Sequence, residues 1–210
     1  GRMRLILAVL DELQTLYNFR TSVLFEILTP LYPHLLKRLP NIVGTEYIKE
    51  SLTSGEIVTI NNQMIRHENL MQLSFKNSSI DLIMHFDVIE HVPDMRVAFR
   101  EIFRCLAPGG VMFFTCPFYH NLEKNIIRAK ISDGKLVHLL EPIYHGNPLS
   151  KSGSLVFQHP TWEVVSMMEE AGFKDIKLPF YYAPFEGIVS NACPYKDGHM
   201  WPAGIIGLKI

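Results

Sequence analysis

The chain has 210 residues, of which 48% are hydrophobic and 20% charged. This composition excludes a disordered chain and allows one α/β domain with a sizeable core. The formal net charge of −1 and the sequence pI of about 6.8 leave no basic surplus to neutralise phosphates, so we expect no nucleic-acid partner. Composition indicates no particular oligomeric state.

The cysteines and apolar runs bear on location. Cys105, Cys116 and Cys193 are isolated and form no CxxC pair, so they predict no disulfide framework and favour a reducing, cytoplasmic setting. The apolar runs that begin at Leu5 and Val111 are far shorter than the roughly 20 residues that span a bilayer. No signal-peptide pattern opens the sequence, and we expect no membrane span.

Predicted helices and strands alternate over the first part of the chain. Apolar residues from Met3 to Leu13 recur at helical spacing, with Asp11 and Glu12 on the other face. A strand at 22–27 and a helix at 31–39 follow, and Leu35, Leu36 and Leu39 face inward on this helix. Next come strands at 41–47 and 57–60, a polar link at 61–69 and a strand at 79–86. A helix at 92–106, with Val97, Ile102 and Leu106 inward, is then broken at Pro108-Gly109-Gly110 and followed by a strand at 111–116. This alternation is typical of a parallel sheet covered on both faces.

Residues 119–158 break this rhythm and contain turn signals, which predicts an insertion or lid within a single domain of residues 1–210. A helix at 161–171 closed by Gly172 and strands at 175–182 and 204–210 complete the pattern. The sequence therefore predicts a doubly wound, mostly parallel, seven-stranded Rossmann-like sheet with helices on both faces and an antiparallel C-terminal edge strand.

In such a sheet ligands bind at the carboxyl ends of the strands. Glu46 ends the second predicted strand, where a carboxylate can accept both hydroxyl protons of a ribose; the alternative is a solvent-exposed acid. Asn69 can hydrogen-bond an adenine edge with Leu70 or Met71 packing on the ring, or it can be a turn residue. Glu90 and His91 follow the strand at 79–86 and lie at the same edge.

The run from Leu73 to Phe118 resembles the core of class I methyltransferases of the type 11 group. It contains, in order, the LSF turn at 73–75, SID at 79–81, the Glu90-His91 pair, Glu101-x-x-Arg104 and the L-x-P-G-G turn at 106–110. The resemblance implies S-adenosyl-L-methionine as cofactor, with Glu46 on the ribose, Tyr47, Asn69 and Leu70 beside the adenine, and Phe86 and Asp87 on the methionine side.

The first motif of that family, an acid followed by a glycine-rich turn, is altered here. Glu26 stands for the acid and Thr29 offers a polar contact, but the segment from 25 to 32 has no glycine. Side chains at 28–31 would narrow the space that glycines leave open. Two functions therefore stay open: methyl transfer to a small-molecule or sugar-type acceptor, and a catalytically inactive methyltransferase-fold binding or scaffold module.

The segment from Arg128 to His145 resembles part of a group of bacterial methyltransferase-like proteins. We expect His138, Tyr144 and Asn147 to contact the substrate, and His145 or His91 to act as general base; the alternative is a rigid lid turn. The nine histidines show no standard ligand spacing, so the sequence predicts no metal site. It also lacks GxGxxG, P-loop and GxSxG motifs.

Overall fold

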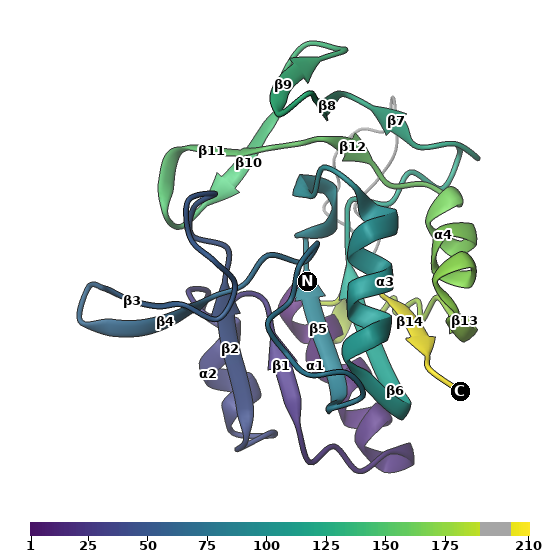
Figure 1. Ribbon diagram of the computed structural model, residues 1–210. Coiled ribbons are helices and arrows are strands. Elements are labelled where there is room, and N and C mark those ends of the chain that lie inside the picture. The colour runs from purple at the N-terminus through teal and green to yellow at the C-terminus, as the bar shows by residue number, and fades with distance from the viewer. Residues whose placement is uncertain (190–202) are drawn as a thin grey trace.

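The computed structural model describes residues 1–189 and 203–210. An eight-stranded sheet forms its middle layer (Figure 1). The strands lie in the order β13 (Lys174–Lys177), β14 (Ile205–Leu208), β6 (Leu106–Thr115), β5 (Ile80–Phe86), β1 (Ser22–Leu24), β2 (Ile42–Glu46), β4 (Gln63–His67) and β3 (Ile57–Ile60). Pairings from β6 through β4 are parallel, whereas β14 is antiparallel to β6 and β13, and β3 is antiparallel to β4.

This arrangement confirms the predicted doubly wound α/β class, with two differences at its edges. The antiparallel C-terminal strand β14 lies one position inside the edge. The polar link expected at 61–69 was wrong, because Gln63–His67 forms strand β4. Asn61 and Asn62 both adopt positive φ, at 48° and 64°, and so form the two-residue turn of a β3–β4 hairpin.

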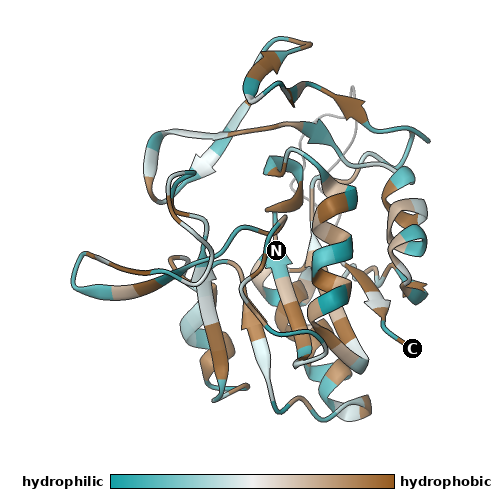
Figure 2. Ribbon diagram, viewed as in Figure 1, coloured by the Kyte–Doolittle hydropathy of each residue, from teal (hydrophilic) through white to brown (hydrophobic). Residues whose placement is uncertain are grey.

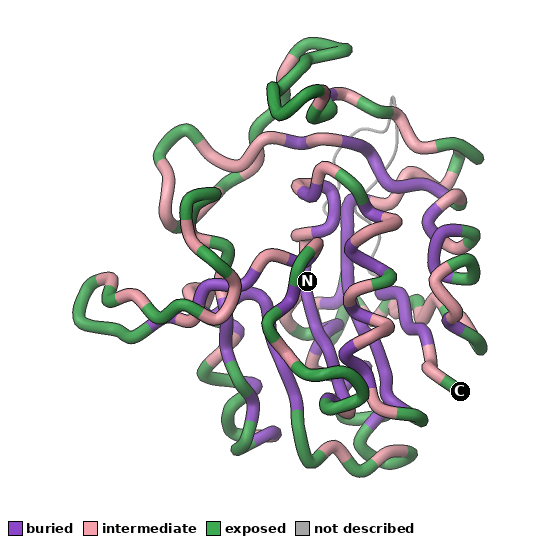
Figure 3. The backbone as a smooth tube through the Cα atoms, in the orientation of Figure 1, coloured by how far each residue is buried: buried purple, intermediate pink, exposed green. Residues whose placement is uncertain are grey.

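Helices cover both faces of the sheet. On one face, α1 (Arg2–Leu16) and α2 (Leu31–Leu36) share a core with alternate residues of the strands; on the other face, α3 (Met95–Cys105) and α4 (Glu163–Ala171) do so. Figure 2 shows hydrophobic residues concentrated on the central strands, which Figure 3 shows as buried. The α/β prediction thus holds because each helix has one apolar face.

Several predicted boundaries needed correction. Helix α2 ends at Leu36, and that side chain is 41% exposed rather than inward. Helix α3 begins after Asp94, whose carboxylate accepts hydrogen bonds from the backbone amides of Arg96 and Val97, so the helix starts later than predicted. Residues 107–110 form an irregularity within β6, between Leu106 paired with Ile80 and Val111 paired with Leu82.

The segment between β6 and α4 lies outside the main sheet, above the carboxyl end of β5 (Figure 1). It contains three two-stranded sheets, formed by β10 (Tyr144–Asn147) with β11 (Ser150–Leu155), β12 (Gln158–His159) with β7 (Ile126–Ile127), and β8 (Ala129–Ser132) with β9 (Lys135–His138). We call residues 119–158 the lid segment. Short 3-10 helices occur at η1 (Ile89–His91) and η2 (Pro184–Glu186). Within the described residues, no helix is both long and apolar enough to cross a membrane.

Candidate functional site

Three acidic residues gather at the carboxyl ends of adjacent strands. Glu26 follows β1, Glu46 ends β2 and Asp87 follows β5, and these strands lie side by side in the order β5-β1-β2. The Glu26 side chain is almost completely buried, and Asp87 has a positive φ of 55°. Because parallel strands point the same way, the sheet brings together acids that are far apart in the sequence.

The first helix contributes a residue that sequence reasoning missed. Nη2 of Arg2 lies 2.6 Å from a carboxylate oxygen of Glu26, and Nη1 lies 2.6 Å from one of Asp87 and donates to the Phe86 carbonyl at 3.2 Å. Burial lowers the pKa of Arg2, but the two carboxylates outweigh it and raise the pKa above its usual value. Helical spacing of apolar residues predicted this helix, but that spacing does not indicate that the first turn of the helix packs against Glu26 and Asp87.

Glu46 is held by backbone amides and keeps one oxygen unpaired. Its carboxylate accepts hydrogen bonds from the backbone of Leu28 and Tyr47, while Oε2 is buried without a hydrogen-bond partner among the described residues. Burial raises the pKa of Glu46 to about 7. Glu26 Oε2 is likewise buried and unpaired, and burial raises the pKa of that carboxyl although Arg2 opposes the shift. Both free oxygens can accept hydrogen bonds from a ligand.

A glycine on the neighbouring strand makes room for the glycine-free first motif. A Cβ on Gly44 of β2 would lie 2.7 Å from both Ile27 Cγ1 and Tyr32 Cε2. Leu31, expected to narrow the ligand space, is instead fully buried in the core beneath α1. Thr29 folds back, with its hydroxyl donating to the Glu26 carbonyl at 3.3 Å. The bulky side chains at 27, 31 and 32 therefore pack within the fold.

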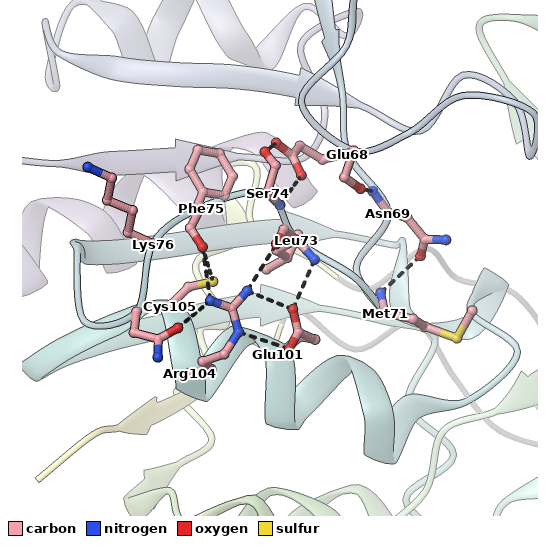
Figure 4. Close-up of polar contacts among 12 residues, drawn as sticks. Glu68, Asn69, Met71, Leu73, Ser74, Phe75, Lys76, Glu101, Arg104 and Cys105 are labelled. Carbon is pink, nitrogen blue, oxygen red and sulfur yellow. Dashed lines mark hydrogen bonds and ion pairs between the residues drawn. The ribbon is translucent and has the colours of Figure 1, made fainter.

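The Asn69 region forms a turn after β4. The Asn69 amide oxygen accepts the Met71 backbone N–H at 2.9 Å, and Leu70 is buried, so Asn69 has the turn role that the sequence left open (Figure 4). Its prediction as an adenine contact remains untested. Tyr47 is half exposed, and its ring centroid lies 5.2 Å from that of His67.

The E-x-x-R motif holds the chain that follows this turn. Nη2 of Arg104 donates to the Leu73 carbonyl at 3.0 Å, and Nη1 donates to the Phe75 carbonyl at 2.9 Å (Figure 4). Glu101 pairs with Arg104 and accepts the Leu73 backbone N–H at 3.0 Å. The motif therefore fixes the position of a loop, and nothing in its contacts indicates chemistry.

The lid segment brings His145 to the Glu90-His91 pair. Nδ1 of His145 lies 3.5 Å from Oε1 of Glu90, and Nε2 of His91 lies 3.7 Å from the same oxygen. The two imidazole rings meet edge to face with centroids 5.1 Å apart. Glu90 is completely buried, and neither of its carboxylate oxygens has a hydrogen-bond partner among the described residues. His91 and His145, the two residues predicted as general-base candidates, thus both lie next to the buried carboxylate of Glu90.

The other predicted substrate residues have different surroundings. Tyr144 is half exposed beside His145 on β10. The Asn147 side chain bonds within its own hairpin, donating to Ser154 Oγ and accepting from the Leu149 backbone, each at 2.7 Å. His138 is exposed on β9, in a different hairpin. Tyr144 and Asn147 therefore lie on the same strand as His145, whereas His138 does not; the roles of all three remain predictions.

A cavity of about 360 Å³ lies at the opposite, amino end of the sheet, lined by residues that include Tyr17, Arg20, Ser22 and Ile42. Ser22 and Ile42 begin β1 and β2, so this cavity is a strand length away from Glu46. Because ligands of doubly wound sheets bind at the carboxyl ends, we place the functional site there and not in this cavity.

Comparison with known proteins agrees with this geometry. Residues 30–114 match the family model described as a methyltransferase domain. A probable S-adenosylmethionine-dependent methyltransferase of Mycolicibacterium smegmatis is 43% identical over 53 residues, which cover 25% of this chain and 21% of that protein. A ubiquinone/menaquinone biosynthesis C-methyltransferase of Vibrio vulnificus is 27% identical over 163 residues, covering 73% of this chain and 57% of that protein. The chain thus matches less than two thirds of the length of either relative.

A solved structure extends the likeness to the whole fold. The S-adenosylmethionine-dependent methyltransferase of Archaeoglobus fulgidus aligns over 100% of this chain and 95% of its own, with a TM-score of 0.55 and 13% identity. The sheet order and the acids at its carboxyl edge thus define a methyltransferase-fold domain. Residues 30–114 are thus similar to a methyltransferase domain, and the chain has the fold of S-adenosylmethionine-dependent methyltransferases.

Proposed function

We propose that this chain transfers a methyl group from S-adenosylmethionine to a small-molecule acceptor held between the lid segment and the carboxyl edge of the sheet. The observation that carries the proposal is the set of three acids at the carboxyl ends of β1, β2 and β5, where Glu26 and Glu46 each have a buried oxygen with no partner among the described residues. The cofactor supplies an electrophilic methyl group, and the residues described here bind and orient the reactants.

The donors and acceptors at the edge match the two ends of the cofactor. Glu46 Oε2 is free to accept ribose hydroxyl groups. The amino-acid end carries one ammonium and one carboxylate, and it would meet two carboxylates, Glu26 and Asp87, with the Arg2 guanidinium between them. Asn69, Leu70, Tyr47 and Phe86 complete the proposed cofactor site, and Thr29 supports it through the Glu26 carbonyl.

The acceptor side is proposed on the lid segment. We assign to it Tyr144, the cluster of Glu90, His91 and His145, and also His138 and Asn147 of the lid segment. An imidazole at this cluster can take the proton of a hydroxyl acceptor. The named substrates of related quinone methyltransferases are small molecules, which supports a small-molecule acceptor and leaves a sugar-type acceptor open. Buried free thiols at Cys105 and Cys116 support a reducing, cytoplasmic setting.

Calorimetric titration with S-adenosylhomocysteine tests the cofactor site. We expect one binding event per chain, and we expect Glu46→Ala to weaken it strongly because the ribose loses its acceptor. Glu50→Gln, which changes an exposed acid on the loop after β2, is the matched control and should bind like the wild type. Absence of binding at millimolar ligand would contradict the enzyme and favour the inactive binding module.

His145→Ala tests the acceptor side. The substitution should abolish methyl transfer, measured as S-adenosylhomocysteine formation with a small-metabolite extract, and should leave S-adenosylhomocysteine affinity unchanged because His145 lies on the lid segment. Full turnover by this variant would remove His145 from the mechanism.

A further inference from the structure

We propose that Glu90, His91 and His145 form a binding site for a divalent transition-metal ion. Each residue offers one ligand atom, and these atoms lie within 4.8 Å of one another. Sequence spacing did not predict this set, because His145 reaches it only through the fold of the lid segment. Two imidazole nitrogens and one carboxylate oxygen form a donor set that suits Zn²⁺, Fe²⁺ or Co²⁺.

The buried acid is the first observation that points to a cation. The Glu90 side chain has no exposed surface, and neither oxygen accepts a hydrogen bond from a described residue. A carboxylate buried in this way is costly unless a cation or hydrogen bonds compensate it. Two imidazole nitrogens lie near it: Nδ1 of His145 is 3.5 Å and Nε2 of His91 is 3.7 Å from Oε1. These separations are close to the roughly 3.3 Å between donors on a tetrahedral zinc ion with bonds of about 2.0 Å.

The hydrogen bonding of His91 is the second observation. Its Nδ1 lies 2.8 Å from the Leu155 carbonyl oxygen, which can only accept, so Nδ1 donates, and in the neutral imidazole Nε2 has its lone pair toward Glu90. Metal-binding histidines characteristically donate their other N–H to a carbonyl or carboxylate in this way, which fixes the tautomer and the ring orientation. Leu155 belongs to β11, the partner strand of the His145 strand.

The position of the site defines what a bound ion would do. Glu90 and His91 belong to η1 after β5, and His145 belongs to β10, so an ion would fasten the lid segment to the edge of the main sheet. Three protein ligands leave a coordination position open, as in catalytic rather than structural zinc sites. The open position would accept an oxygen or nitrogen atom of the acceptor; this role rests on the proposed function, whereas metal binding does not.

A bound ion changes the role of the histidines. The lone pair that binds an ion is the one that would otherwise take a proton, so in the metal-bound enzyme His91 and His145 are ligands and not bases. Both roles predict loss of turnover in His145→Ala. Metal affinity is therefore the measurement that separates them.

The test uses the full chain without an affinity tag, treated with a chelator and then titrated with Co²⁺ and Zn²⁺. We expect one ion per chain, visible d–d absorption of the Co²⁺ form, and displacement of Co²⁺ by Zn²⁺. His145→Ala, His91→Ala and Glu90→Gln should each weaken binding by at least the roughly 10- to 100-fold that loss of an outer-shell partner costs. His138→Ala, an exposed histidine on the lid segment, is the matched control and should bind as the wild type does.

Folding is checked on the same samples. His145 is partly exposed, so His145→Ala should keep the circular dichroism and the S-adenosylhomocysteine affinity of the wild type. Zn²⁺ should raise the unfolding temperature of the wild type and not that of this variant. The metal site is overturned if the wild type binds no stoichiometric ion, or if the alanine variants bind as tightly as the wild type. Normal cofactor binding alongside either result would leave the proposed function intact.

Discussion

Burial of the Glu46 carboxyl group is unfavourable for its ionised form, yet the same position suits the proposed contact with a ligand. Its carboxylate accepts two backbone hydrogen bonds but is sufficiently buried that its pKa rises to about 7. Ionisation is therefore opposed in the folded chain, while the proposed contact with the ribose of the cofactor needs the ionised form as a double acceptor. This conflict between burial and binding is typical of functional sites.

The shift predicts a pH dependence of cofactor affinity. Affinity for S-adenosylhomocysteine should be about tenfold weaker at about pH 6 than at about pH 8, because the fraction of ionised Glu46 changes by about that factor around a pKa near 7. Calorimetric titrations across this range measure the effect. Glu46→Gln should bind weakly at every pH, and a wild-type affinity that does not change would show that ribose binding does not depend on Glu46 ionisation.

The same shift predicts the sign of a stability effect in the ligand-free protein. The folded pKa of about 7 lies above the ordinary value of 4.5, so the free energy of unfolding falls as the pH rises from 4.5 through about 7. Glu46→Gln should therefore be more stable than the wild type above this range, by about 1–3 kcal/mol. Urea unfolding at low and high pH measures the difference, and equal stability of the two proteins at high pH would contradict the burial argument.

Among the structural elements, the first-motif loop and strand β2 depend on each other. The family's usual glycines are absent from the loop, but Gly44 on β2 gives space to Ile27 and Tyr32. Of the residues at 28–31 that were expected to narrow the cofactor space, Leu31 is buried in the core, and the expectation for the other three stays a prediction. In the folded protein, the missing side chain at Gly44 leaves the space that the side chains of Ile27 and Tyr32 fill.

Gly44→Ala tests whether Ile27 and Tyr32 need the space that Gly44 leaves. The added Cβ would lie 2.7 Å from atoms of Ile27 and Tyr32, so we expect a loss of about 1–3 kcal/mol in the free energy of unfolding, as is usual for overpacking. Cofactor affinity should fall as well, because Leu28 of the same loop donates to Glu46. Val43→Ala, at an exposed position of the same strand, is the control for urea unfolding and calorimetry. Unchanged stability and affinity would mean that the loop relaxes freely.

The β10–β11 hairpin positions His145, and two glycines in it form a matched pair. Gly153 has a φ of 82°, and a Cβ there would clash with the His145 carbonyl oxygen, whereas a Cβ on Gly146 would meet nothing within 4 Å. Gly153→Ala should therefore displace His145 and lower turnover without changing cofactor affinity, and Gly146→Ala should do neither. Steady-state kinetics beside calorimetry separate these outcomes; equal turnover of the two variants would refute the positioning role.

At the scale of the whole molecule, the proposed cofactor site depends on global folding. Arg2 of α1, Glu26 after β1, Glu46 of β2 and Asp87 after β5 come from elements that meet only in the folded sheet. No short segment of the chain carries the site. A ligand should therefore bind the folded state alone.

Ligand binding should accordingly raise the unfolding temperature. At a free S-adenosylhomocysteine concentration 100 times its Kd, the folded state should gain about 2.7 kcal/mol by mass action. Thermal unfolding at increasing ligand concentration measures the shift, and Glu46→Ala should need much more ligand for the same shift. A constant unfolding temperature at concentrations where calorimetry shows saturation would mean that the site survives in a partly unfolded chain.

Local sequence patterns determined the class of this fold and the acids at its carboxyl edge. Apolar spacing revealed α1, α3 and α4, and the alternation of elements indicated the doubly wound sheet, because both depend on residues a few positions apart. Glu46 could be placed because the end of a strand is also a local feature, whereas Glu26 and Asp87 were placed by the resemblance to a known family. Strand β4 was missed because its alternation is short and polar.

Only the tertiary structure determined which distant residues meet. The docking of Arg2 between two acids, the fit of Gly44 against Ile27 and Tyr32, and the meeting of His145 with Glu90 depend on strand order and on the path of the lid segment. No residue type or spacing encodes these contacts, since they result from packing the whole core at once. The sequence therefore located the edge of the sheet where we propose that the ligand binds, and the three-dimensional packing decided which groups surround it.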